Sequence, residues 1–201
     1  MYTHKVSDGA AVTCRPAPPL PAMQKTGFTL VEMLGVLAIT ATLASIAAPS
    51  MMALIDSVQI SAASHDLLAG LHLARSEAIK RNSPVVLCKS ADGVSCAGSG
   101  GWEQGWIVFH DANNNSLRES SETIIRREMP LSGSLRLTGN QNVVRYVSFA
   151  ASGATKLIGG GFQAGTLTVC RLSPFGGEAR QIVLNAVGRP RLKKTAVSLC
   201  D

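Results

Sequence analysis

The sequence predicts an α+β fold in which one long N-terminal helix packs on an antiparallel β-sheet head. An apolar run with a single charged residue continues into a segment whose apolar residues recur at spacings of three and four, as on one face of a helix. From Pro84 onward, short β-type runs alternate with clusters of Gly, Asn and Ser, which is the pattern of strands joined by turns. Such a helix and such strands can bury their apolar sides only against one another, which gives two packed layers.

The apolar run spans residues 28–55 and contains one ionisable side chain, Glu32. At about 1.5 Å rise per residue, a helix of this length can cross a bilayer core of about 30 Å. A carboxylate near the bilayer core costs about 2.5 to 3.5 kcal/mol on insertion scales, so Glu32 needs a partner. The run itself supplies none. An ordinary secretory signal peptide has a shorter apolar region followed by its cleavage site.

The residues that open this run resemble the prepilin signature of type IV pilins and type II secretion pseudopilins: Lys25-Thr26-Gly27-Phe28-Thr29-Leu30-Val31-Glu32. The resemblance implies that a prepilin peptidase of the inner membrane cuts after Gly27 and that the new amine of Phe28 is methylated. It also implies that Glu32 pairs with the N-terminal amine of a neighbouring subunit in a filament. Pro49 stands where such helices commonly kink.

The predicted organisation has four parts. Residues 1–27 are the leader, within which Met23 offers a second start that would leave residues 1–22 untranslated. Residues 28–52 are the transmembrane and assembly helix, and residues 53–83 are an amphipathic helix that ends before Pro84. The β-rich head occupies residues 84–201. Its predicted strands are Val85–Cys88, Trp106–His110, Thr123–Arg127, Leu135–Leu137, Val143–Phe149, Leu167–Arg171, Gln181–Leu184 and Arg189–Leu192.

This strand series resembles the GspH/FimT branch of pseudopilins and minor pilins. The residues that carry the resemblance are Gly105-Trp106-Ile107-Val108-Phe109 and the closing Gly188-Arg189-Pro190-Arg191, and the resemblance covers residues 23–201.

Cleavage after Gly27 would remove Cys14 and leave four cysteines, an even number that suits an oxidising periplasm. Four cysteines allow three pairings. The short Gly- and Ser-rich loop between Cys88 and Cys96 favours that local pair, which leaves Cys170 for Cys200. A zinc site is disfavoured because no two of them have the C-x₂-C spacing.

The segment that starts at Asp111 has oxygen-bearing residues in the register of a calcium loop: Asp111, Asn113, Asn115, Glu119 and Glu122. The sixth position is Ser116, where such a loop needs glycine, and the flanking segments read as strands. Asp and Asn also form turns by bonding to nearby backbone, so a plain turn is favoured over calcium. His65 and His72 are seven residues apart, which indicates a polar helix face and not a metal site.

The C-terminal half carries the positive charge. Residues 53–128 hold seven basic and nine acidic side chains, whereas residues 129–201 hold nine and two. The predicted DNA contacts are Arg189, Arg191, Lys193 and Lys194. The first three are alternate residues of an extended strand, so they project from one face with a spacing comparable to that of phosphates. Pro190 places this strand at an edge. In FimT-like minor pilins, which this motif resembles, Gly-Arg-x-Arg is associated with DNA capture. A charged edge that prevents aggregation is the alternative.

The sequence therefore predicts a minor pilin or pseudopilin that is stored in the inner membrane, with its head in the periplasm, and built with other pilins into a filament, where the head binds DNA for uptake. The rival is a minor pseudopilin of a type II secretion system with a structural role and no DNA binding. No arrangement of residues resembles a nucleophile motif, so we expect no enzyme and no cofactor.

Overall fold

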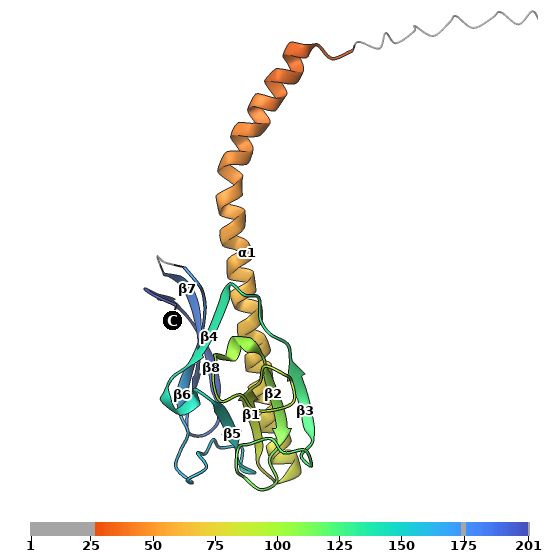
Figure 1. Ribbon diagram of the computed structural model, residues 1–201. Helices are drawn as coiled ribbons and strands as arrows, with labels where there is room; N and C mark the ends of the chain where they lie inside the picture. Colours follow the sequence, from red (N-terminus) through yellow and green to blue (C-terminus); the bar gives the residue numbers. More distant parts are fainter. Residues whose placement is uncertain (1–26, 174–175, 201) are drawn as a thin grey trace, which may run out of the picture. The chain divides into compact units, whose positions relative to one another are not determined.

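The computed structural model describes residues 27–173 and 176–200, with the side chains of residues 47–50 excepted. The chain divides into two compact units, residues 1–45 and residues 46–201. The first unit contains the start of the helix α1. The second contains the rest of that helix and all the strands described below (Figure 1).

Helix α1 spans Leu30–Arg81, and both of its ends are capped. Thr29 is the N-cap, because its Oγ1 accepts a hydrogen bond of 3.2 Å from the backbone N–H of Glu32. At the other end, Asn82 adopts a left-handed conformation with φ of 49°. The backbone N–H groups of Asn82 and Ser83 donate to the carbonyls of Ile79 and Ala78. This Schellman arrangement, followed by a proline, ends the helix where the sequence predicted it.

The strands form two antiparallel four-stranded sheets. Sheet one has the order β3-β2-β1-β5 and sheet two the order β4-β6-β7-β8. The bounds in sheet one are Val85–Lys89 for β1, Trp106–His110 for β2, Ile124–Glu128 for β3 and Tyr146–Phe149 for β5. Those in sheet two are Leu135–Gly139 for β4, Gly165–Arg171 for β6, Gly177–Leu184 for β7 and Pro190–Val197 for β8. Two 3₁₀ turns, η1 (Trp102–Gln104) and η2 (Gln141–Val143), complete the head.

Every predicted run overlaps an observed strand, with two differences in the details. Val143 was expected to begin a strand, but it lies in η2 and β5 begins at Tyr146. The single sheet that the sequence suggested is two sheets. Alternation along a strand reports which side chains face the core, but it does not report which strands pair, and both sheets can place an apolar face on the same helix.

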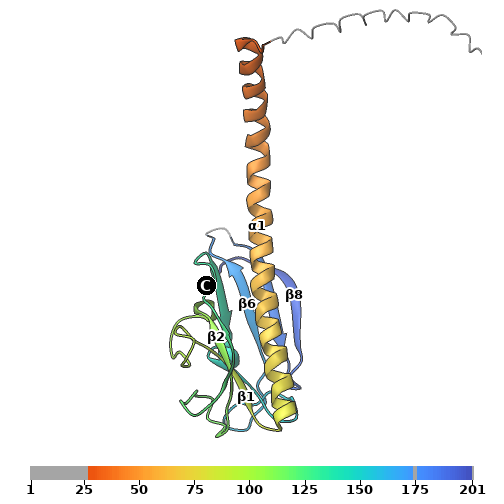
Figure 2. The ribbon, with the colours of Figure 1, turned by 90° about the vertical axis from the view of Figure 1, so that its right-hand side faces the viewer.

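The main core lies between the second half of α1 and both sheets (Figure 2). The helix contributes its predicted stripe to this core: Ile60, Ala63, Leu67, Leu71, Ala74 and Ala78 are all buried. Gly70 sets the closeness of this packing, because a Cβ there would lie 3.0 Å from Leu87 Cδ1 and 3.2 Å from Trp106 Nε1. Helix and sheet one therefore approach more closely than any larger residue at this position would permit.

Candidate functional site

The basic strand β8 lies at an edge of sheet two, as Pro190 predicted, since only β7 pairs with it. A turn brings the chain into this strand. The N–H of Gly188, which has φ of 74°, donates to the carbonyl of Asn185 at 2.9 Å, and the N–H of Arg189 donates to Asn185 Oδ1 at 2.9 Å. A Cβ at position 188 would lie 2.0 Å from the carbonyl oxygen of Gly153, so glycine is required there. The turn leaves Arg189 exposed next to the strand.

Alternation along β8 divides its side chains between two faces. Pro190 is buried and Leu192 packs against the main core, so the even-numbered positions face α1. Arg191 and Lys193 are exposed, and their strand partners on β7 are Val183 and Gln181. The predicted projection of these two cations from one face, away from the core, is therefore present, and we call this side of sheet two its outer face.

Lys194 differs from the other predicted contacts. It lies on the same side as Leu192, and its Nζ is 3.3 Å from Glu178 Oε2, while Arg180 is 3.3 Å from the other oxygen of that carboxylate. Burial raises the pKa of Glu178, but hydrogen bonds from Lys194 and Ser57, together with the charges of Lys194 and Arg180, leave this pKa below its ordinary value. Lys194 is thus held in an ion pair on the helix side of the sheet.

The outer face also carries a row of hydroxyl and amide side chains that the sequence analysis did not single out. They are half-buried and come from all four strands: Thr138, Thr166, Thr168, Gln181 and Thr195. Among the described strand residues of this face there is no carboxylate. The alternation Thr166-Leu167-Thr168-Val169 was a usable signal, since the apolar residues of this run face the core. Uncharged donors and exposed cations are both groups that contact phosphate and sugar in nucleic-acid complexes.

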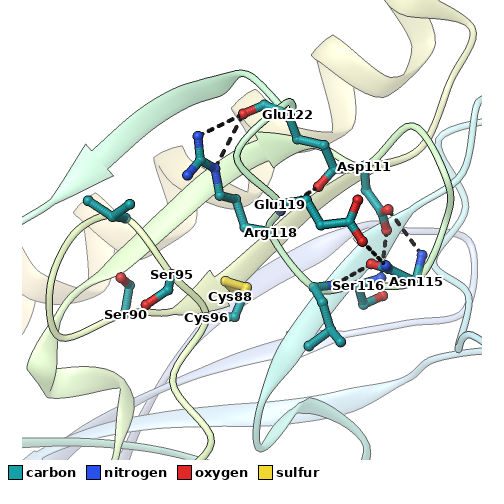
Figure 3. The surroundings of a disulfide bond; sticks show 12 residues. Cys88, Ser90, Ser95, Cys96, Asp111, Asn115, Ser116, Arg118, Glu119 and Glu122 are labelled. Carbon is teal, nitrogen blue, oxygen red and sulfur yellow. Dashed lines mark hydrogen bonds between the residues drawn. A yellow bond between two sulfur atoms is a disulfide. The ribbon is translucent and has the colours of Figure 1, made fainter.

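The loop with the calcium register is a turn whose carboxylates accept N–H bonds (Figure 3). Asp111 accepts bonds from the backbone N–H of Asn115 at 3.0 Å and of Ser116 at 2.8 Å. Glu122 accepts bonds from the N–H of Ala112 at 2.9 Å and of Glu119 at 3.0 Å. Burial raises the pKa of Asp111 above its ordinary value, against the effect of these N–H donors.

The remaining predicted ligands of this loop are also engaged. The amides of Asn113 and Asn115 donate to Glu119 at 3.0 and 2.9 Å. Across residues 27–173 and 176–200, no three His, Cys, Asp or Glu side chains gather as a metal site would need, and His65 and His72 are exposed on the helix. The geometry is that of the turn that the sequence favoured over calcium.

Both predicted disulfides are present. Cys88 at the end of β1 is bonded to Cys96, with Cα atoms 5.6 Å apart, and Cys170 of β6 is bonded to Cys200, with Cα atoms 5.8 Å apart. The second bridge passes over β7 and encloses a small cluster with Ala179 and Val197 on the outer face. It fixes the end of the chain that follows the basic strand.

At the N-terminal end, Gly27 and Phe28 precede the helix, and Phe28 is exposed. By length and composition, α1 is one helix that could cross a membrane. The leader residues 1–26, with Met23, Lys25 and the cysteine at position 14, lie outside the described part of the chain, as do the side chains around Pro49. The role of Glu32 in pairing between subunits stays a prediction.

Comparison with known proteins gives two family matches. A model described as type II transport protein GspH matches residues 63–188, and one described as a prokaryotic N-terminal methylation motif matches residues 23–48. No curated protein matches the chain.

Three solved structures match the chain. The type IV minor pilin FimU of Pseudomonas aeruginosa has a TM-score of 0.52 at 18% identity, covering 72% of this chain and 97% of FimU. A second crystal form of FimU gives 0.50 at 19% identity, with 70% and 99% covered. The minor pseudopilin EpsH of the type 2 secretion system of Vibrio cholerae gives 0.46 at 12% identity, with 67% and 96% covered. At these identities the FimU likeness shows the fold alone, and the likeness to EpsH is too weak to carry an argument.

Proposed function

Because the chain belongs to the GspH family and carries the N-terminal methylation motif, we propose that its helix is built into a pilus-like filament whose exposed head binds DNA for uptake. Family membership makes the chain a minor pilin or pseudopilin of a type IV pilus or a type II secretion system. The same proposal places the helix in the inner membrane before assembly and the head in the periplasm. It also makes other pilins the neighbours of this subunit in the filament.

The observation that carries the DNA proposal is the outer face of sheet two. Arg189, Arg191 and Lys193 are exposed, and no ion-pair partner for them exists within the described part of the chain. Lys194, by contrast, is held in an ion pair by Glu178 at 3.3 Å. Three unpaired cations beside a surface of threonine hydroxyls suit a polyanion whose phosphates are contacted without regard to base sequence. Affinity should therefore be modest and strongly dependent on salt.

The salt dependence is the test. If three phosphates are neutralised, the logarithm of the binding constant should fall against the logarithm of salt concentration with a slope of about −2.7 for duplex DNA. Arg191→Gln should flatten this slope by about 0.9 on every sequence tested. Lys194→Gln is the matched control, because it removes the same charge from the same strand on the opposite face, and it should leave the slope unchanged.

The rival is a secretion pseudopilin with no role in DNA binding. Fluorescence-anisotropy titrations of the head with labelled duplex DNA at low salt distinguish the two. If the wild-type head does not bind, or if Arg191→Gln and Lys194→Gln weaken binding equally, the DNA proposal fails. The structural and priming role in a secretion filament then becomes the better assignment.

Assembly depends on a different residue, Glu32. We propose that a prepilin peptidase cuts after Gly27, that Phe28 becomes the methylated N-terminus, and that Glu32 pairs with the amine of a neighbouring subunit. Glu32 also stands three residues after the N-cap Thr29, so its replacement could disturb the helix start instead. Glu32→Gln separates these effects, since glutamine serves equally well at that helix position but carries no charge.

Intact-mass spectrometry and filament assembly read out this proposal. Glu32→Gln should be cut and methylated like the wild type but should enter filaments poorly. Normal assembly of this variant would exclude the charge pairing. A mature N-terminus downstream of position 49 would exclude the pilin-type processing altogether.

A further inference from the structure

A cavity of about 250 Å³ lies on the face of sheet one that points away from α1. Val86 and Cys88 of β1 face this side, whereas Val85 and Leu87 face the main core. Four segments that are distant in sequence meet around the cavity: the disulfide Cys88–Cys96, the loop 115–117, the start of β5, and the hairpin at Ile158. A dry cavity of about 150 Å³ holds a benzene ring, so this one can hold a ring with a short substituent.

The walls of the cavity are mainly apolar. They are formed by the Cys88–Cys96 disulfide, the ring of Tyr146 and the side chains of Leu117 and Ile158. Leu117 is 55% exposed and Ile158 is 51% exposed, so two large apolar side chains stand in water beside a concave apolar surface. Such exposure at a concave site favours an apolar occupant, which would remove this surface from water.

Two polar groups mark the same cavity. Arg145 is the charged residue of its lining, and within residues 27–173 and 176–200 its guanidinium has no ion-pair partner. Ser116 also lines the cavity and is 4% exposed, and its buried hydroxyl has no hydrogen-bond partner in the described part of the chain. A small turn of this side chain toward a polar atom of a ligand would give the hydroxyl a bond, and buried hydroxyls are rarely left without one.

The cavity is also held in shape before any ligand arrives. The disulfide fixes one wall, and the bonds from Asn115 and Ser116 to the Asp111 carboxylate fix a second (Figure 3). The backbone N–H of Ile158 donates to the Tyr146 hydroxyl at 3.3 Å, which ties the hairpin to β5. A preformed pocket loses little conformational freedom when it binds, and this favours small ligands.

We propose that this cavity binds a small apolar carboxylate, whose ring or branched alkyl group fills the cavity while its carboxylate pairs with Arg145. The carboxylate can belong to a free compound or to the C-terminal residue of a peptide. Apolar walls select the body of the ligand, and the lone cation selects its charge. This site is separate from the outer face of sheet two and does not depend on DNA binding.

The mature full-length protein is titrated with phenylacetate in detergent micelles, and binding is measured by isothermal titration calorimetry. Phenylacetamide keeps the ring without the charge, and acetate keeps the charge without the ring. Phenylacetate should bind saturably and about tenfold more tightly than phenylacetamide, a difference of about 1.4 kcal/mol, because the uncharged amide cannot form the charge-assisted bond to Arg145. Acetate should show no saturable binding. Because all variants share the same micelles, partition of ligand into detergent cancels between them.

The variants then locate the site. Arg145→Gln should weaken phenylacetate binding about tenfold and abolish the preference over phenylacetamide. Ser116→Gly should weaken it about threefold, and glycine suits the left-handed backbone there, where φ is 57°. Lys156→Gln is the matched control: this exposed cation lies in the same hairpin but does not line the cavity, and its loss should change nothing.

Two outcomes overturn the proposal: absence of saturable binding by the wild type, or equal binding by wild type and Arg145→Gln. A tripeptide Gly-Gly-Phe and its C-terminal amide distinguish the two sources of the carboxylate. Tighter binding of the acid form of the peptide than of phenylacetate supports a peptide C-terminus. Binding of phenylacetate alone supports a free compound.

Discussion

The disulfide between Cys170 and Cys200 should contribute more stability than the one between Cys88 and Cys96. The first bridge joins residues 30 positions apart and the second joins residues 8 apart. In the chain-entropy model, closing loops of these sizes stabilises the fold by about 3.6 and about 2.5 kcal/mol respectively, because the longer loop restricts the unfolded chain more. Replacing each pair with alanine should therefore lower the free energy of unfolding by unequal amounts, with a difference of about 1 kcal/mol.

The two pairs make a fair comparison, because three of the four cysteines are buried and the fourth, Cys96, packs against a buried cluster. The loss of sulfur packing is thus similar in both variants. For a head of this size, each kcal/mol shifts the melting temperature by about 2 to 4 °C. The melting temperature of residues 46–201, measured by circular dichroism, should fall by roughly 7 to 14 °C without the longer bridge and by roughly 5 to 10 °C without the shorter one.

The longer bridge also has a local effect, because Cys200 lies three residues after the end of the basic strand β8, an edge strand paired only with β7. Without it, the amide hydrogens of β8 should exchange faster, while those of β1 should not change. Equal losses of stability in the two variants would refute the loop-length argument. Unchanged exchange in β8 would show that pairing with β7 holds this strand unaided.

Three further measurements test individual contacts by urea unfolding of the head. Ser116→Gly should stabilise it by about 1 kcal/mol, because glycine relieves a backbone φ of 57° and removes a buried hydroxyl that has no partner in the described part of the chain. Gly105→Ala should destabilise it by more than about 2 kcal/mol, since φ is 104° and a Cβ would lie 2.6 Å from a backbone oxygen, whereas Gly133→Ala, with open space, should be neutral. The pKa of Glu178 is lowered in the fold, so its stabilising effect should be present above its unfolded pKa of about 4.5 and disappear as pH falls through the folded value. Glu178→Gln should remove that part of the pH dependence.

Periodicity was sufficient to predict the elements of this fold. The helix stripe at spacings of three and four is buried, and the predicted stop at Asn82-Ser83-Pro84 is a Schellman cap. These features depend on residues within a few positions of one another. The pairing of β4 with β6, and so the presence of a second sheet, depends on contacts across about thirty residues and leaves no mark in local alternation.

The loop that begins at Asp111 was predictable because Asp and Asn bond to backbone groups two to five residues away. The cavity beside it was not. Its lining joins Cys88, Leu117, Arg145 and Ile158, which come from four separate segments. Arg145 in the sequence is one of nine basic residues in a charged half, and only the fold shows that it lines a pocket with mainly apolar walls.

Only part of the arrangement of the basic strand β8 can be predicted from its own residues. Alternation alone could have placed Lys193 and Lys194 on opposite faces, since the side chains of adjacent residues in a strand point to opposite faces. It could not have shown that Lys194 meets Glu178, because that contact depends on the register in which Arg180 pairs with Lys194, set by the turn at Asn185 and Gly188. The sequence offers four basic side chains for DNA, and three of them have no ion-pair partner among residues 27–173 and 176–200. The predicted salt slope therefore changes from about −3.6 to about −2.7, and this difference is large enough for a titration to decide.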